Sequence, residues 1–202
     1  MSDKRVLLVG GFHEMIELCE ACGYTIAGII DAGLGKAYYG YPVVGTDDDA
    51  AQLRAQFPDC ALVLTPDAPA VRQRLHAYYS AFGFEFASVI SPQARVSRFA
   101  TLGKGVILQA GANVSAATHI GDFVKLNTYA NVMHDSTVGD FTTIAPNAVV
   151  LGYVHVGSLV YVGANSTILP KVSVQDKATV GAGAVVAKDV SSGLIVKGVR
   201  AK

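Results

Sequence analysis

The chain has 202 residues, of which 51% are hydrophobic and 16% are charged, and its formal net charge is zero. This length allows one large or two small domains, and the neutral charge gives no indication of a nucleic-acid or membrane-surface partner. No apolar run approaches the length of a membrane span, and the first residues are typical of a strand rather than of a signal peptide. Three cysteines are an odd number, which disfavours a disulfide framework. We therefore expect a cytoplasmic protein.

Residues 1–90 alternate between strand-like and helix-like segments. In chain order, the expected elements are a strand at 5–9, a helix at 12–22, a strand at 25–30, a helix at 47–56, a strand at 60–65, a helix at 68–82 and a strand at 84–90. This alternation predicts a small parallel sheet of the Rossmann type. Cys19 and Cys22 fall inside the first expected helix, a position that favours packed thiols over a redox motif.

A fold of this type binds phosphate at its first strand-to-helix turn. The turn contains Gly10, Gly11, Phe12 and His13, and Asp31 ends the second strand, where an acidic side chain commonly meets a ribose. The turn lacks the G-x-G-x-x-G pattern, so a dinucleotide is poorly supported and a mononucleotide-linked sugar fits better. The alternative is that the glycines only form a turn and that Asp31 caps the next segment.

Residues 91–202 carry a repeat of six residues. Every sixth position from 96 to 186 is aliphatic: Val96, Leu102, Leu108, Val114, Ile120, Leu126, Val132, Val138, Ile144, Val150, Val156, Val162, Ile168, Val174, Val180 and Val186. This period belongs neither to a helix nor to a plain strand. It predicts triangular coils of eighteen residues whose aliphatic side chains point inward, with no inserted loop. Gly recurs one position after the aliphatic residue, and we attribute this to tight corners.

These hexads resemble those of the hexapeptide-repeat acyltransferases, which implies a left-handed parallel β-helix. The resemblance also implies a homotrimer with active sites between subunits. Two further features narrow the choice of family. The segment 40–47 reads G-x-P-V-x-G-x-D, and an N-x6-H-[DE] motif lies within the hexads. In these features the chain is similar to the NeuD/PglD group of sugar acetyltransferases of bacterial glycan synthesis. The resemblance implies that residues 1–90 bind a nucleotide-sugar acceptor and that residues 91–202 bind acetyl-CoA.

Acetyl transfer from a thioester needs a base that takes a proton from the acceptor, for which histidine is suited near neutral pH. His134 is followed by Asp135, and a carboxylate bonded to an imidazole fixes its tautomer. The resemblance implies that His134 is the proton acceptor and that Asp135 tunes it, while Asn127 is expected to orient the acceptor. One coil beyond His134 lies Gly152, whose backbone N–H is expected to stabilise the oxyanion. The alternative is a corner histidine with a solvated neighbour.

The resemblance places acetyl-CoA in a groove between the coils of neighbouring subunits. The matching positions are Thr143, Ala164 and Ala182, whose small side chains leave room for the pantetheine arm. Two departures from the family pattern stand out. Thr143 occupies a position where many relatives have histidine, and the first glycine turn is one residue shorter, with Phe12 before His13. The chain end, 197–202, resembles a G-x-P-A-[KR] terminus, and its cations suit either CoA phosphates or a solvated tail.

We favour an N-acetyltransferase that acts on a nucleotide-linked amino sugar, and three alternatives stay open. One is O-acetylation of a sugar such as sialic acid, and another is a non-catalytic scaffold. The third is a metal-dependent lyase of the γ-carbonic anhydrase type, which needs three convergent histidines. His119 and His155 are two coils apart on one edge, whereas His134 has a different phase, so their convergence is poor. We expect no metal.

Overall fold

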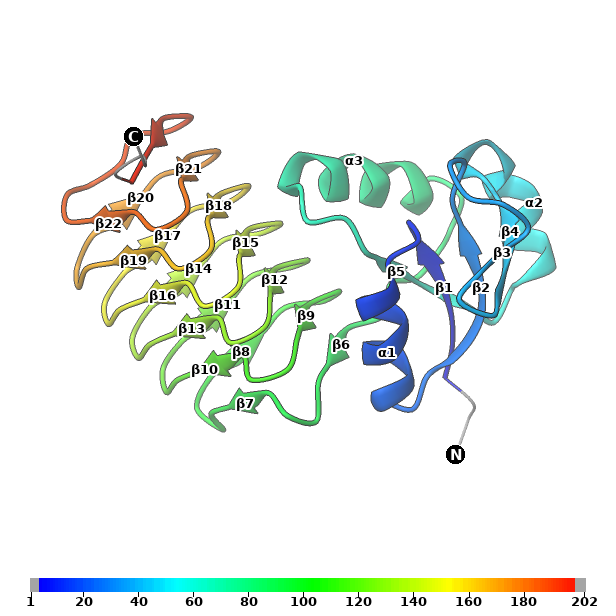
Figure 1. Cartoon of the computed structure of the whole chain (residues 1–202), viewed down its shortest axis with the longest axis horizontal. Coiled ribbons are helices and arrows are strands. Elements are labelled where there is room, and N and C mark those ends of the chain that lie inside the picture. The colour runs from blue at the N-terminus through cyan, green and yellow to red at the C-terminus, as the bar shows by residue number, and fades with distance from the viewer. Residues whose placement is uncertain (1–3, 199–202) are drawn as a thin grey trace. The chain divides into compact units, whose positions relative to one another are not determined.

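The computed structural model describes residues 4–198 (Figure 1). The described chain forms two compact units with a boundary between Val89 and Ile90, and the short segment Ala68–Ala70 groups with the second unit. None of the helices in the described range is both long and apolar enough to cross a membrane.

The first unit is built on a sheet with the strand order β3-β4-β2-β1-β5. Its elements are β1 Arg5–Val9, α1 His13–Ala21, β2 Thr25–Ile30, β3 Ala37–Tyr38, β4 Tyr41–Gly45, the 3-10 turn η1 Asp47–Asp49, α2 Ala50–Gln56, β5 Ala61–Leu64 and α3 Pro69–Ser80. In the sheet, each pair of neighbours along β4-β2-β1-β5 is parallel. The edge strand β3 pairs with β4 in the antiparallel direction. Because parallel strands end at the same edge, the ends of β1, β2 and β4 meet there, where ligands commonly bind.

The structure differs from the sequence-based expectation at two places in this unit. The last expected strand is reduced to β6, Val89–Ile90, and an isolated bridge between Leu62 and Phe86. The hairpin of β3 and β4 was not expected, because β3 has only two residues and β4 contains Pro42. It turns through Tyr39 and Gly40, whose φ angles are 46° and 86°. Positive φ at both central residues is the requirement of a type I′ two-residue hairpin turn.

The two cysteines of the C-x-x-C segment differ in environment. Cys19 is fully buried, whereas Cys22 is partly exposed, and neither forms a disulfide. Burial raises the pKa of the Cys19 thiol to about 12. Because the thiolate is the reactive form, Cys19 is expected to resist alkylation at pH 8 while Cys22 reacts. Mass spectrometry of iodoacetamide-treated native protein checks this, and equal labelling of the two cysteines contradicts it. Labelling in denaturant is the control, because all three cysteines then react.

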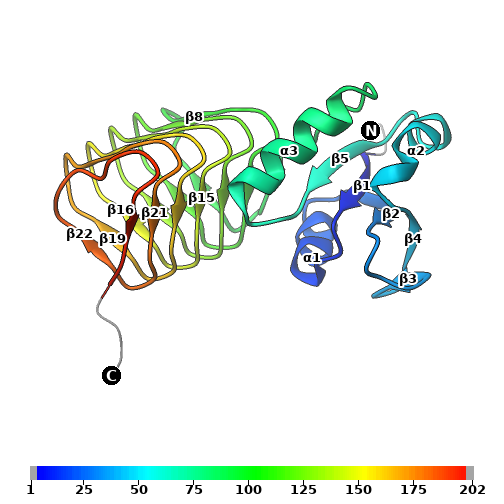
Figure 2. The same ribbon diagram turned by 90° about the horizontal axis from the view of Figure 1, so that it is seen from above.

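The second unit is a stack of two-residue strands joined by corners (Figures 1 and 2). After β6, its strands are β7 Arg95–Val96, β8 Thr101–Leu102, β9 Ile107–Leu108, β10 Asn113–Val114, β11 His119–Ile120, β12 Lys125–Leu126, β13 Asn131–Val132, β14 Thr137–Val138, β15 Thr143–Ile144, β16 Val149–Val150, β17 His155–Val156, β18 Tyr161–Val162, β19 Thr167–Ile168, β20 Ser173–Val174, β21 Thr179–Val180, β22 Val185–Val186 and β23 Ile195–Val196. Each aliphatic residue of the six-residue period is the second residue of a strand, as the repeat predicts.

Strands one coil apart pair in parallel and form three flat faces. The faces are a six-stranded sheet from β7 to β22, a five-stranded sheet from β8 to β20 and a seven-stranded sheet from β6 to β23. From β7 to β22 registers advance by eighteen residues, so that Val114 pairs with Val132 and Val132 with Val150, whereas β21 pairs with β23 sixteen residues on. These side chains are fully buried and form one continuous apolar core. The parallel stacking agrees with the predicted left-handed β-helix.

The recurring glycines have a different cause from the one predicted. The residues with left-handed φ at the corners are mostly not glycine, and from Ala117 to Lys177 they recur every six residues: Ala117, Phe123, Tyr129, Asp135, Phe141, Asn147, Tyr153, Leu159, Asn165, Lys171 and Lys177. The recurrent glycines instead lie where coils approach closely. A Cβ on Gly103 would come within 2.4 Å of Asp122 Oδ1 and 2.6 Å of the Gly121 carbonyl carbon. Tight stacking, rather than backbone freedom, requires glycine there.

Candidate functional site

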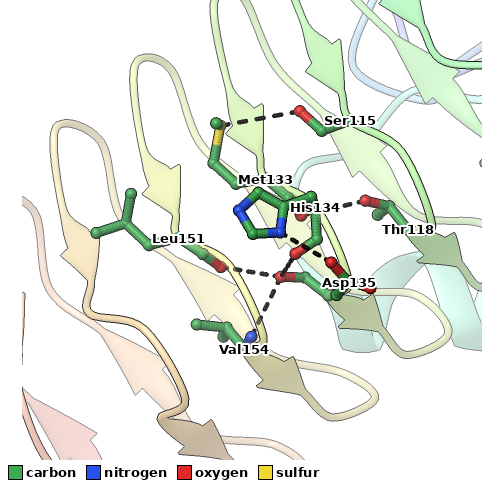
Figure 3. A network of polar contacts seen from close by, with 8 residues as sticks. Ser115, Thr118, Met133, His134, Asp135, Leu151 and Val154 are labelled. Atoms are coloured by element: carbon green, nitrogen blue, oxygen red, sulfur yellow. Dashed lines mark hydrogen bonds and ion pairs between the residues drawn. The ribbon is translucent and has the colours of Figure 1, made fainter.

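His134 and Asp135 form the corner between β13 and β14 (Figure 3). The His134 Nδ1 and Asp135 Oδ2 atoms are 2.8 Å apart, and the two side chains are 52% and 41% exposed. A carboxylate oxygen accepts hydrogen bonds, so Nδ1 carries the proton of the neutral imidazole. Nε2 is therefore left with a lone pair on a side chain that solvent reaches. This is the arrangement of a general base with an orienting carboxylate.

The Ser136 side chain links this corner to the next coil by two hydrogen bonds. Its hydroxyl donates to Leu151 O at 2.9 Å and accepts from Val154 N–H at 3.2 Å (Figure 3). Between these two partners lies Gly152, directly against the imidazole. A Cβ on Gly152 would lie 2.8 Å from Cε1 and 2.9 Å from Nε2 of His134. Only a residue without a side chain fits beside the ring in this position.

Gly152, whose amide is predicted as an oxyanion donor, is buried against the His134 imidazole. Its carbonyl accepts a hydrogen bond from Lys171 N–H at 3.2 Å, whereas nothing within residues 4–198 accepts one from its N–H. The structure therefore places Gly152 beside His134, as the eighteen-residue spacing predicts. Its role in stabilising an oxyanion stays a prediction.

Tyr153 is a neighbour of His134 that the sequence reasoning missed. Its ring contacts the imidazole edge to face, with centroids 5.4 Å apart and an angle of 89° between the planes. The signal was present in the coil length, because Tyr153 stands eighteen residues after Asp135.

Asn127 lies at a different corner from His134. It follows β12 of the seven-stranded sheet, whereas His134 follows β13 of the six-stranded sheet. Asn127 is buried, and its backbone carbonyl accepts a hydrogen bond from Ala130 N–H. The two residues thus occupy successive corners of one coil, and one chain does not bring them together. The expected role of Asn127 in orienting the acceptor stays a prediction.

The glycine turn and Asp31 of the first unit lie together at the carboxyl edge of its sheet. Asp31 accepts hydrogen bonds from Gly11 N–H at 2.8 Å and from Gly33 N–H at 2.7 Å. The Thr65 hydroxyl lies 2.8 Å from Val9 O and 2.9 Å from Gly10 O and holds the other side of the turn. Asp31 therefore does cap the following segment. Each carboxylate oxygen has a second lone pair, so these bonds leave acceptor capacity for a ligand hydroxyl.

A cavity of about 390 Å³ opens beside this turn, at the ends of β1, β2 and β4. Its lining includes Gly10, Asp31, Asp47 and Arg74. Asp47 Oδ1 accepts a hydrogen bond of 2.6 Å from the Tyr79 hydroxyl. Burial, and after it the bond to Asp47, raises the pKa of Tyr79, which therefore stays a neutral donor at physiological pH.

Phe12 and His13 lie at the start of α1, on the other side of the turn. Phe12 is the residue before the helix, and the two rings meet edge to face at 5.5 Å. The His13 imidazole stacks on Tyr39 with centroids 5.4 Å apart. His13 is therefore fixed by the β3–β4 hairpin rather than by the glycines. The structure bonds Gly11 to Asp31, with Gly10 next to Gly11 in the turn, and places His13 at their margin.

The three predicted acetyl-CoA residues do not share one environment. Ala164 and Ala182 follow β18 and β21, so they lie one coil apart at the corner between the seven-stranded and six-stranded sheets. Both are accessible, Ala182 more than Ala164. Thr143 is fully buried in β15 and offers no surface to a ligand in this chain. Of the predicted cations of the terminus, Lys197 is exposed, and Arg200 and Lys202 lie outside the described residues.

The remaining histidines of the repeat lie on the five-stranded sheet. His119 and His155 stand on β11 and β17, with β14 between them, and each ring bonds to a threonine one coil earlier. His134 lies at a corner, so the three do not converge. Across residues 4–198, no group of three or more His, Cys, Asp or Glu side chains is placed to hold a metal ion.

Comparison with known proteins agrees with this architecture. The family described as bacterial transferase hexapeptide (six repeats) matches residues 117–152. A variant of the GDP-perosamine N-acetyltransferase of Caulobacter crescentus, solved with CoA and GDP-perosamine, is 33% identical, with a TM-score of 0.91 over 100% of this chain and 97% of that one. The acetyltransferase domain of PglB from Neisseria gonorrhoeae, solved with acetyl coenzyme A, is 27% identical, with a TM-score of 0.88 over 98% and 97% of the two chains.

WeeI from Acinetobacter baumannii is also 27% identical, with a TM-score of 0.85 over 96% of this chain and 97% of that one. A search of curated protein sequences found no match. The hexapeptide match and the close structural matches solved with CoA or acetyl-CoA identify the chain as an acyltransferase. The chain belongs to the hexapeptide-repeat sugar acetyltransferases, the family that its sequence predicts.

Proposed function

We propose that the protein transfers the acetyl group of acetyl-CoA to the amine of a nucleotide-linked amino sugar. The His134–Asp135 pair, with Gly152 against the imidazole, is the observation that carries this proposal. The full-length similarity to an enzyme solved with CoA and GDP-perosamine supports both substrate classes. The PglB domain with acetyl coenzyme A supports the acetyl donor.

In this reaction, the acceptor nitrogen attacks the thioester carbonyl carbon and loses a proton to His134 Nε2. The Asp135 carboxylate holds the imidazolium that forms, because it bonds to Nδ1–H. The negative oxygen of the tetrahedral intermediate accepts a hydrogen bond from the Gly152 N–H. The carbon–sulfur bond then breaks, and the CoA thiolate takes the proton from Nε2. No covalent enzyme intermediate is needed.

The first unit supplies the acceptor site in this proposal. The sheet edge with Gly10, Gly11 and Asp31 has the position at which Rossmann-type folds bind nucleotides. Asp31 accepts from a ribose hydroxyl through its second lone pairs, and the glycine turn lies against the phosphates. Phe12 and His13 border the site. The cavity of about 390 Å³ beside Gly10 and Asp31 is of a size that holds part of a nucleotide.

A homotrimer completes the site. His134 lies at the corner that follows the six-stranded sheet, and Ala164 and Ala182 lie at the corner that precedes it. Within one chain, the six-stranded sheet therefore lies between His134 and these acetyl-CoA positions. Val185 on this face is 68% exposed, so the face carries apolar surface that a partner would cover. Packing these faces around a three-fold axis brings the base corner of one subunit to the acetyl-CoA corner of the next.

The test is a thiol-release assay with acetyl-CoA and a panel of GDP-, UDP- and dTDP-linked amino sugars. We expect turnover of at least one amino sugar, with mass spectrometry showing an N-acetylated product. Activity only on free sialic acid or another hydroxyl acceptor would replace this proposal with O-acetylation. If the folded protein turned over none of the acceptors, the result would favour a non-catalytic scaffold.

A further inference from the structure

Tyr153 places an aromatic ring beside His134, although the fold does not require an aromatic residue at this corner. The equivalent corner positions one coil before and one coil after it are Asp135 and Lys171, which share its left-handed φ near +60°. The corner therefore forms without an aromatic side chain. The Tyr153 ring is 57% exposed, so burial in the core does not explain it either. Its ring contact is with the imidazole of His134.

The backbone fixes the distance between these two residues. Tyr153 N–H donates to His134 O at 3.1 Å, which ties the two corners together. Gly152 closes the space against Cε1 and Nε2, and Asp135 bonds to Nδ1. The Tyr153 ring stands at 89° to the imidazole plane. Three neighbours thus define the orientation of a side chain that is otherwise half exposed.

We propose that Tyr153 is a positioning residue, whose ring holds the His134 imidazole between Gly152 and Asp135 with Nε2 toward the acceptor amine. Without the ring, the imidazole rotates about its side-chain bonds into solvent and leaves Asp135. A misplacement of about 1 Å costs on the order of 100-fold in rate when it affects a reacting group. The consequence for catalysis rests on the proposed function, whereas the consequence for the ring orientation does not.

The experiment compares Tyr153→Ala and Tyr153→Phe in the full-length protein. Tyr153→Ala is expected to lower kcat by about 10- to 100-fold, with an unchanged KM for acetyl-CoA, because only the base is displaced. Tyr153→Phe is expected to retain activity, because it keeps the ring. Phe99→Ala is the matched control: Phe99 is an aromatic residue of similar exposure, 63%, and lies two coils before Asp135 on the same edge.

A second measurement needs no substrate. NMR of protein labelled with 15N-histidine reports which imidazole nitrogen is protonated, and His134→Ala assigns the signal. We expect the Nδ1–H tautomer of His134 in the wild type and in Tyr153→Phe, and a mixture of tautomers in Tyr153→Ala. An unchanged signal together with an unchanged kcat in Tyr153→Ala would overturn the proposal. An equal loss in Tyr153→Phe would also overturn it, since the hydroxyl would then be responsible. If no acceptor is turned over but the tautomers behave as expected, the proposed function fails while the positioning role stands.

Discussion

Replacing His134 with alanine is expected to reduce kcat by about 100- to 10,000-fold, the range typical of a lost general base. The physical reason is that this variant loses the imidazole nitrogen that we propose takes the proton from the acceptor nitrogen. The KM for acetyl-CoA should change little, because the proposed role of His134 is to take the acceptor's proton rather than to bind the acetyl donor. Steady-state kinetics of thiol release provides the measurement.

His155→Ala is the matched control for this variant. His155 is also exposed on the β-helix and bonds to a neighbouring side chain, Thr137 Oγ1 at 2.6 Å, but lies on the five-stranded sheet. Its replacement should leave kcat near the wild-type value. Circular dichroism and thermal unfolding establish that both variants fold. A wild-type kcat for His134→Ala would show that His134 is not the general base.

Gly152→Val is expected to lower kcat by on the order of 100-fold while leaving the protein folded. The Cβ alone would lie 2.8 Å from Cε1 and 2.9 Å from Nε2 of His134, closer than such contacts occur in proteins. Because the imidazole is half exposed, it is displaced into solvent rather than compressed, and the core does not have to move. The measurement is kcat together with the midpoint of thermal unfolding.

Ser158→Ala serves as the comparison, because Ser158 occupies the same repeat position as Gly152 at a different corner. It should retain both activity and thermal stability. A fully active Gly152→Val would show that the imidazole tolerates another orientation. Equal losses of kcat and of stability in this variant would mean that the whole corner had been disrupted.

The six-residue period predicted the β-helix because its cause is local and repeated. Each aliphatic residue points into the same core, so one pattern determines every strand from β7 to β22. Counting eighteen residues from His134 also identified Gly152 as its neighbour. The same counting from Asp135 leads to Tyr153, so that contact was predictable in principle.

Other features depend on contacts that no spacing encodes. Asp31 bonds to the N–H groups of both Gly11 and Gly33, which required knowing how two loops meet at the sheet edge. The burial of Thr143 could not be predicted from a resemblance, because it depends on what lies over that strand. The recurrent glycines were assigned to the corners, whereas the distance between coils explains them.

The eighteen-residue register also limits how genes for such a chain can change in length. Loss of one whole coil would leave every later residue on its own face, and the stack would close over the gap. Loss of a single hexad would rotate everything after it by one face and move Ala164 and Ala182 away from the corner they now share. Duplications and deletions in this part of a gene should therefore survive selection mainly in steps of eighteen codons. Longer or shorter relatives would then differ by complete turns of the helix.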